Sequence, residues 1–271
     1  MQKIALHSVP RSGSTWLGNI LNSHPEVDFS FQPLFSYAFK GFLTEKSSET
    51  EIDEFFKKIK NSNDSFINQK EGIDKGIIPK FHKNKNTSHV IYKEVRYHYI
   101  LKNLLCQDKN LKVIGLVRHP MATINSWLNA PKEFKAELGW KIEDEWRFAL
   151  KKNKNSLEEF NGYEKWKETV QLFLELKNEF PDRFYLLNYD KLLKNCENEV
   201  EELFSFCNLE LHPQTNVFLE KSSNTNTDDA YSVFKKKEND HGWKNTLPEF
   251  IVNEIKADEE FQHLNSIFQW I

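Results

Sequence analysis

The chain has 271 residues and a formal net charge of −3, from 37 basic and 40 acidic side chains. This length suits one sizeable α/β domain and is too short for two large ones. The charge balance argues against a protein that binds nucleic acid or an anionic membrane. No apolar run approaches the roughly 20 residues that span a bilayer. The first expected strand begins almost at Met1, which leaves no room for a secretory signal, so we expect a cytoplasmic protein.

The first predicted strand covers about residues 3–8 and leads into Val-Pro-Arg-Ser-Gly-Ser-Thr-Trp-Leu at positions 9–17. The proline and the glycine should break the strand, and a helix over about 14–23 should follow. Such a turn leaves backbone N–H groups free at the start of the helix, where the helix dipole also favours an anion. Arg11 and two hydroxyls line the same turn. The sequence therefore predicts a site for a phosphate with a second negative group beside it.

This loop differs from the P-loop of ATP-dependent kinases. When Gly13 is taken as the second glycine of G-x-x-x-x-G-K-[ST], Ser8 stands at the first glycine and Ser14 at the lysine. The lysine that would hold the β- and γ-phosphates of ATP is therefore missing, and a basic residue stands three positions earlier, at Arg11. No aspartate-rich magnesium motif is evident. A P-loop kinase is the less favoured alternative.

Two stretches have a composition unlike the rest of the chain. Residues 44–89 are rich in Lys, Asn, Ser, Asp and Glu, with one short helix expected over 51–60, and residues 130–162 are similarly charged. Insertions of this kind on a rigid sheet often carry substrate specificity. We expect both stretches to be excursions of one domain that form a lid or an acceptor wall.

A second phosphate site is predicted after another strand. Residues 112–117 are almost continuously apolar, as buried parallel strands are. Arg118 follows at once, Pro120 suits the first turn of a helix over 121–129, and Ser126 lies eight residues after Arg118. The guanidinium can hold a phosphate with two parallel hydrogen bonds, and the hydroxyl can add a third.

The same alternation continues along the chain. Helices are expected over 163–179 and 195–207, and the predicted strands lie at about 3–8, 90–95, 112–117 and 183–188. Strands that alternate with helices indicate a parallel sheet covered on both faces. Ligand loops of such sheets lie at the carboxyl ends of the strands, where both predicted phosphate sites fall. We therefore predict a single α/β domain over residues 1–271 with a P-loop-like nucleotide-binding fold.

Three segments resemble those of PAPS-dependent sulfotransferases. The loop that begins at Arg11 resembles their 5′-phosphosulfate loop, which reads P-K-S-G-T-T-W in cytosolic members and R-S-G-[ST]-[ST] in carbohydrate and tyrosyl-protein members. Arg118 and Ser126 match, spacing included, the arginine and serine with which the family binds the 3′-phosphate. Residues 234–245 resemble the family's closing F-x-R-K-G-x-x-G-D-W-K-N, with nine residues from Phe to Trp in both. The segments span the chain from residue 4 to about 256, and the match is weak between roughly 30 and 90.

The resemblance implies which residues bind PAPS or its product PAP: Arg11, Ser12, Gly13, Ser14, Thr15, Trp16, Arg118, Ser126, Tyr189, Lys236 and Lys237. Tyr189 would contact the adenine, because Asn-Tyr-Asp-Lys-Leu at 188–192 resembles the family's Y-E-D-[ML], although a tyrosine at the edge of the core would read the same. Lys236 and Lys237 fall on the family's R-K pair, although three successive lysines are often only a solvated surface. Glu238 replaces the family's glycine there, and its carboxylate would repel a phosphate.

Sulfuryl transfer is an in-line displacement at sulfur that expels the 5′-phosphate of PAP. The protein must supply a cation beside the bridging oxygen and a base beside the acceptor, and the donor requires no metal. Arg11 falls on the family's loop lysine and can be that cation. Its role would be electrostatic, because an arginine does not give up its proton.

The base is open among three residues. Relatives use the histidine of K-T-H or a glutamate shortly after the phosphosulfate loop, and here Gln32 replaces that glutamate. The strand end Lys-Glu-Val-Arg at 93–96 lines up with K-T-H or K-T-V-R, with Glu94 at the threonine. We take Glu94 as the first candidate, His98 as the next and Glu26 as the third. Glu94 between two cations could equally be an ion-pair partner.

The function that fits these observations is a PAPS-dependent sulfotransferase without a metal, acting on a hydroxyl or amine of a carbohydrate, lipid-linked or other small acceptor. A non-catalytic PAP- or PAPS-binding protein is the alternative that Gln32 and Glu238 keep open. The sequence identifies neither the acceptor nor the oligomeric state.

Overall fold

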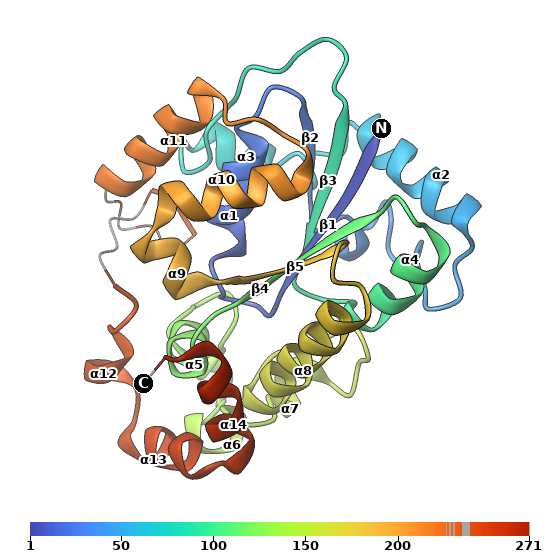
Figure 1. Cartoon of the computed structure of the whole chain (residues 1–271). Helices are drawn as coiled ribbons and strands as arrows, with labels where there is room; N and C mark the ends of the chain where they lie inside the picture. The colour runs from blue at the N-terminus through green and yellow to red at the C-terminus, as the bar shows by residue number, and fades with distance from the viewer. Residues whose placement is uncertain (226, 228, 230, 235–238, 271) are drawn as a thin grey trace.

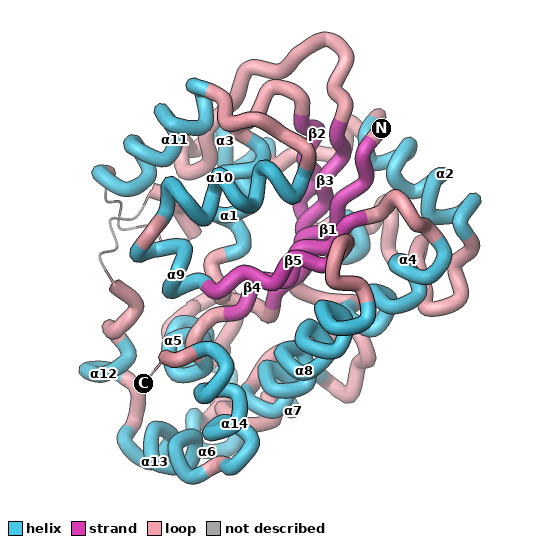
Figure 2. Tube along the Cα trace, in the orientation of Figure 1, coloured by secondary structure: helices cyan, strands magenta, loops and turns pink. Residues whose placement is uncertain are grey.

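A computed structural model describes every residue except 226, 228, 230, 235–238 and 271. Its centre is a five-stranded parallel sheet in the order β2-β3-β1-β4-β5 (Figures 1 and 2). The strands are β1 (Gln2–Ser8), β2 (Val27–Phe31), β3 (His89–Glu94), β4 (Lys112–Val117) and β5 (Phe184–Asn188). The prediction of a single α/β domain with a central parallel sheet is confirmed.

Helices cover both faces of this sheet, as the two sides of Figure 1 show. Their bounds are α1 (Ser14–Asn22), α2 (Glu49–Lys60), α3 (Lys70–Asp74), α4 (Leu101–Gln107), α5 (Pro120–Leu128), α6 (Ile142–Glu145), α7 (Leu150–Asn153), α8 (Tyr163–Glu179), α9 (Tyr189–Lys194), α10 (Cys196–Cys207), α11 (Pro213–Asn224), α12 (Trp243–Thr246), α13 (Glu249–Ala257) and α14 (Glu259–Phe268). Short 3₁₀ turns are η1 (Pro33–Phe35), η2 (His98–Ile100) and η3 (Ala136–Leu138).

Two apolar cores result because successive strand side chains point to opposite faces. Ile4, Leu6 and Ile91 pack with α1, α9, α10 and α11 on one face. Val90 and Tyr92 pack on the other face with α2, α4, α5, α8 and the C-terminal helices. Adjacent residues of β3 therefore belong to different cores, which decides below which of its charged side chains can reach a ligand.

Strand β2 was absent from the predicted elements. Its residues, Val-Asp-Phe-Ser-Phe, alternate apolar and polar as a half-buried edge strand does. The strand is short and lies within a stretch that the other motifs do not mark, so only this alternation could have revealed it. The helix expected over 51–60 begins two residues earlier in the structure, because Ser48 and Glu51 form a reciprocal capping box.

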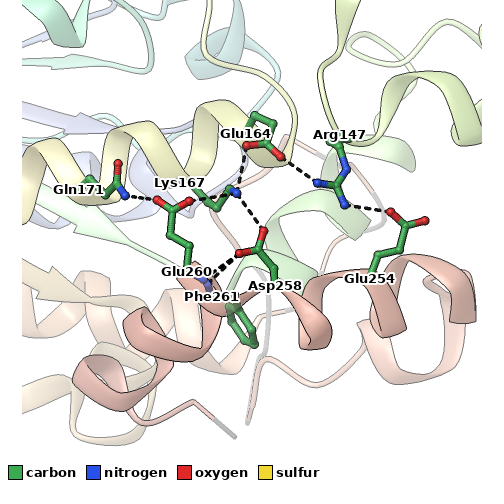
Figure 3. A network of polar contacts seen from close by, with 8 residues as sticks. All are labelled: Arg147, Glu164, Lys167, Gln171, Glu254, Asp258, Glu260 and Phe261. Carbon is green, nitrogen blue, oxygen red and sulfur yellow. Dashed lines mark hydrogen bonds and ion pairs between the residues drawn. The ribbon is translucent and has the colours of Figure 1, made fainter.

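The C-terminal helices are fastened to α8 by a polar network (Figure 3). Lys167 of α8 contacts Asp258 at 2.8 Å and Glu164 and Glu260 at 3.1 Å each. Burial alone would lower the pKa of Lys167, but its hydrogen bonds to these carboxylates raise it. Asp258 also caps α14 by accepting from two backbone N–H groups. One lysine thus ties α8 to the start of α14.

Replacing this lysine tests the network. Lys167→Met keeps most of the side-chain volume and should lower the free energy of unfolding by about 1–3 kcal/mol, because three carboxylates lose a charge-assisted partner. That loss corresponds to about 2–4 °C of Tm per kcal/mol in a domain of this size. Lys165→Met is the matched control, since its partner Glu168 is 54% exposed and such surface pairs contribute little. Equal losses in thermal unfolding of the two variants would contradict the assignment.

Candidate functional site

A cavity of about 1100 Å³ opens at the carboxyl ends of the strands. The segments that directly follow β1, β3, β4 and β5 all contribute to its wall, because parallel strands end at one edge of the sheet. Residues of both charged excursions line it as well: 65–78 from the first, and Lys132, Glu133 and Lys152 from the second. Helix α2 of the first excursion instead packs its apolar face into the core.

The loop after β1 has a conformation suited to an anion. Gly13 is the N-cap residue of α1 with φ 85°, and Arg11 also adopts a left-handed φ of 67°. The first backbone N–H groups of α1 have no partner inside the helix. The buried Ser12 hydroxyl has no hydrogen-bond partner among the described residues. These donors fit a phosphate or sulfate group, as the sequence predicted.

Gly13 is required by a close approach as well as by its φ. A Cβ at this position would lie 2.3 Å from a ring carbon of Tyr189. Tyr189, directly after β5, lines the cavity together with Trp16, and the two rings meet edge to face with centroids 6.3 Å apart. Trp16 Nε1 donates to Ser222 Oγ at 3.0 Å. Tyr189 is therefore both at the edge of the core and on the cavity wall.

Arg118 and Ser126 lie beside this loop, so the structure brings the two predicted phosphate sites together. Arg118 Nη1 donates to the backbone carbonyl of Arg11 at 2.5 Å, and Arg11 Nε donates to Ser126 Oγ at 3.2 Å. The Arg118 guanidinium carbon lies 5.1 Å from the centre of the Tyr189 ring. The sequence did not single out Asp240, whose carboxylate accepts from both Nε and Nη2 of Arg118. Lys236 and Lys237, the remaining predicted phosphate ligands, lie outside the described residues.

Two more cations line the cavity at the end of β3. Lys93 is 3% exposed, and its Nζ lies 4.5 Å from the centre of the Phe31 ring. Burial lowers the pKa of Lys93 to about 7. Arg96 donates to Glu159 Oε1 at 2.8 Å and to Gln32 Oε1 at 3.0 Å. Lys93 was not among the predicted site residues. Successive side chains of a strand point to opposite faces of the sheet, so Lys93 and its neighbour Glu94 could not both face the same site.

The three residues predicted as candidate bases do not line the cavity. Glu94 is fully buried on the opposite face of β3, where its Oε1 accepts from the backbone N–H of Leu34 at 2.7 Å. Burial raises the pKa of Glu94 to about 8. His98 is fully buried against His7 and Phe160, and burial holds its pKa well below the usual range. Glu26 directly precedes β2 and so lies at the amino ends of the strands, whereas the cavity lies at their carboxyl ends.

Glu133 is a carboxylate that does line the cavity. It lies in the excursion 130–162 that was predicted to form a lid or acceptor wall, but no motif pointed to this residue. Its Oε2 pairs with Lys152 Nζ at 2.7 Å. Burial would raise the pKa of Glu133, but Lys152, Arg96 and Arg11 hold it below the usual value. Its charge in turn bears on Lys93. The cavity wall thus combines basic side chains with a carboxylate from the second excursion, residues 130–162.

The described residues offer neither a candidate metal site nor a candidate membrane span. They contain no group of three His, Cys, Asp or Glu side chains placed to hold a metal ion. None of the helices in that part of the chain is both long and apolar enough to cross a membrane.

Known proteins resemble this chain in sequence family and in fold. A family model of the sulfotransferase domain matches residues 1–264, whereas no curated protein matches the sequence. The structure of mouse sulfotransferase SULT7A1 complexed with PAP is similar with a TM-score of 0.56 and 14% identity, covering 100% of this chain and 89% of that one. The sulfotransferase domain from the curacin biosynthetic pathway gives 0.52 and 18%, covering 99% and 97%. Retinol dehydratase in a complex with retinol and PAP gives 0.54 and 13%, covering 97% and 80%. At these identities the likeness concerns the fold.

The close approach of Gly13 to Tyr189 can be measured. Gly13→Ala should cost about 1–2 kcal/mol for its left-handed φ and about 1–3 kcal/mol more for the clash with the ring. Gly41→Ala is the matched control, because Gly41 has φ 72° and no atom within 4 Å of its would-be Cβ. In urea unfolding, Gly13→Ala should lower the free energy of unfolding more than Gly41→Ala does. When Tyr189→Ala is already present, the additional loss from Gly13→Ala should fall to that of Gly41→Ala. Equal losses would mean that the ring yields without cost.

Proposed function

Because the chain belongs to the sulfotransferase domain family, we propose that it transfers the sulfuryl group of PAPS to a hydroxyl or amine and releases PAP. One observation carries the assignment of the donor. The loop after β1 and the Arg118–Ser126 pair meet in one cavity, joined by the contacts of Arg11 with both. Two adjoining anion sites in one cavity suit a nucleotide with separate 5′- and 3′-phosphates. The cytoplasmic location remains a prediction.

The nucleotide would lie across the carboxyl ends of β1, β4 and β5. Backbone N–H groups at the start of α1 and the Ser12 hydroxyl would hold the 5′-phosphosulfate, and Arg118 with Ser126 the 3′-phosphate. Tyr189 and Trp16 offer aromatic faces to the adenine. The predicted ligands Gly13, Ser14 and Thr15 line the same wall, which supports their assignment.

Lys93 and Arg11 would stabilise the charge that grows on the bridging oxygen. Burial holds the pKa of Lys93 at about 7 without a ligand, and the negative charge of bound PAPS would raise it, because an opposite charge favours the protonated form. Lys93 would then be a cation when PAPS is present. Arg11 keeps the electrostatic role that the sequence predicted.

The residue that accepts the proton is a point on which the proposed site differs from the sequence prediction. Glu94 points to the face of the sheet away from the cavity. Glu133 lines the cavity, close to Arg11, Lys93 and Arg96. PAPS would neutralise part of that positive charge and so raise the pKa of Glu133, which makes it a better base. We therefore favour Glu133 over Glu94, His98 and Glu26 as the acceptor of the proton.

An aromatic wall supports an acceptor with a flat or apolar face. Phe66 meets Phe31 and Phe35 with ring centroids 5.6 and 5.9 Å apart, and all three line the cavity. Such rings can stack on the face of a sugar or contact a lipid chain. The carbohydrate, lipid-linked or other small acceptor expected from the sequence fits this wall, with residues 65–78 as one side of it.

The donor assignment is tested by thermal unfolding with nucleotides and without magnesium. PAP should stabilise the protein more than ADP does, because only PAP has a 3′-phosphate for Arg118 and Ser126. At a concentration a hundred times its Kd, PAP should add about 2.7 kcal/mol. Equal shifts from PAP and ADP, or a strict need for magnesium, would favour the kinase alternative.

The base assignment is tested by two amide substitutions. Glu133→Gln should lower the turnover of PAPS about a hundred-fold or more over a panel of phenols, sugars and amines, with PAP binding unchanged or tighter because a nearby negative charge is removed. Glu94→Gln should stay within a few-fold of the unaltered protein, since its carboxylate does not reach the cavity. The reverse result would restore Glu94 as the base. No turnover by the unaltered protein, with tight PAP binding, would favour a non-catalytic PAP-binding protein.

A further inference from the structure

The side chain of Arg118 is engaged by a carboxylate of the protein itself. Arg118 Nε donates to Asp240 Oδ2 at 2.6 Å, and Nη2 donates to the other oxygen of the same carboxylate. Both side chains are nearly inaccessible, with exposed fractions of 7% for Arg118 and 3% for Asp240. A two-pronged contact of this kind is also how a guanidinium holds a phosphate.

Asp240 is held in this position by contacts of the segment that follows it. Trp243, three residues later, stacks on His119, the neighbour of Arg118, with ring centroids 5.0 Å apart and an interplanar angle of 29°. Thr246 Oγ1 accepts from Asn125 Nδ2 of α5 at 2.9 Å. The start of α12 is thus fixed to the segment that follows β4, and it delivers the carboxylate to Arg118.

We propose that Asp240 is a specificity-determining residue that competes with the 3′-phosphate of the nucleotide for Arg118. The inference rests on the proposed function. A phosphate that takes the Nε and Nη2 edge of Arg118 must displace the carboxylate, and one that binds elsewhere on the guanidinium meets a negative charge a few ångströms away. Either way Asp240 weakens the binding of PAP and PAPS, whereas ADP, without a 3′-phosphate, leaves the ion pair intact.

Asp240 therefore narrows the preference for PAP over ADP without abolishing it. The same carboxylate would return to Arg118 when PAP leaves, so the buried guanidinium never lacks a counter-charge. An unpaired buried charge is costly, and an internal anion at the 3′-phosphate site removes that cost from the unliganded protein. Product release then exchanges one anion for another.

Asp190 provides a matched control. It lies close enough for its charge to act on both Arg118 and Asp240. Among the described residues, however, its Oδ2 accepts no hydrogen bond, and Arg118 donates to Asp240 and to the Arg11 carbonyl. Asp190→Asn removes a negative charge near the site without freeing the Arg118 edge, so a general electrostatic effect and direct competition can be told apart.

The experiment is calorimetric titration of PAP and ADP into the unaltered protein, Asp240→Asn and Asp190→Asn. Asp240→Asn should tighten PAP binding at least about ten-fold, the scale of one charge-assisted contact, and change ADP binding less than about three-fold. Asp190→Asn should raise the affinity for PAP relative to ADP by less than Asp240→Asn does, because Asp190 acts on Arg118 through its charge alone. The inference would be overturned if the affinity for PAP relative to ADP were unchanged or smaller in Asp240→Asn than in the unaltered protein.

The proposed function and this inference fail in different ways. If the unaltered protein and both variants bind neither nucleotide, the proposed function is wrong. If PAP binds but its preference over ADP does not respond to Asp240→Asn, only the inference is wrong. Should Asp240→Asn and Asp240→Ser not fold alone, folding rescued by PAP and not by ADP supports exchange of the carboxylate for a phosphate. Failure to fold with either nucleotide would make Asp240 a structural residue and overturn the proposal.

Discussion

The parallel register of β1 with both of its neighbours is the constraint on which the site depends. Leu6 of β1 lies opposite Lys93 of β3 on one side and Ile114 of β4 on the other. The three strands therefore end level, and the residues that follow them reach one space. A slip of one residue would turn each strand's side chains to the other face. Two buried cores on opposite faces make that slip costly and so fix the site.

Alternation along β3 sorts two adjacent charged residues into different roles. Lys93 faces the cavity, where burial without a carboxylate contact in the described residues lowers its pKa. Glu94 faces the other core and accepts the backbone N–H that begins the η1 turn. That turn carries Phe35 to the cavity wall, beneath the guanidinium of Arg96. The buried carboxylate thus acts on the site through the turn that it holds, and not through contact with it.

Several charged side chains that line the cavity are paired within the protein. Arg118 pairs with Asp240, Arg96 with Glu159, and Glu133 with Lys152. Because unpaired buried charges are costly, these internal partners stabilise the fold around the cavity.

The sequence by itself determined the elements whose signal is local. The loop around Gly13 and the Arg118–Ser126 spacing could be predicted, because a turn or a strand–helix junction lies within a few residues of chain. Four of the five strands followed from apolar runs, and the edge strand β2 did not, because it is short and half polar. Only the tertiary structure placed Lys93 and Glu133 on one cavity wall and Asp240 against Arg118. Their contacts depend on which face a strand turns inward and on which distant segments fold back over the sheet, and neither is a property of neighbouring residues.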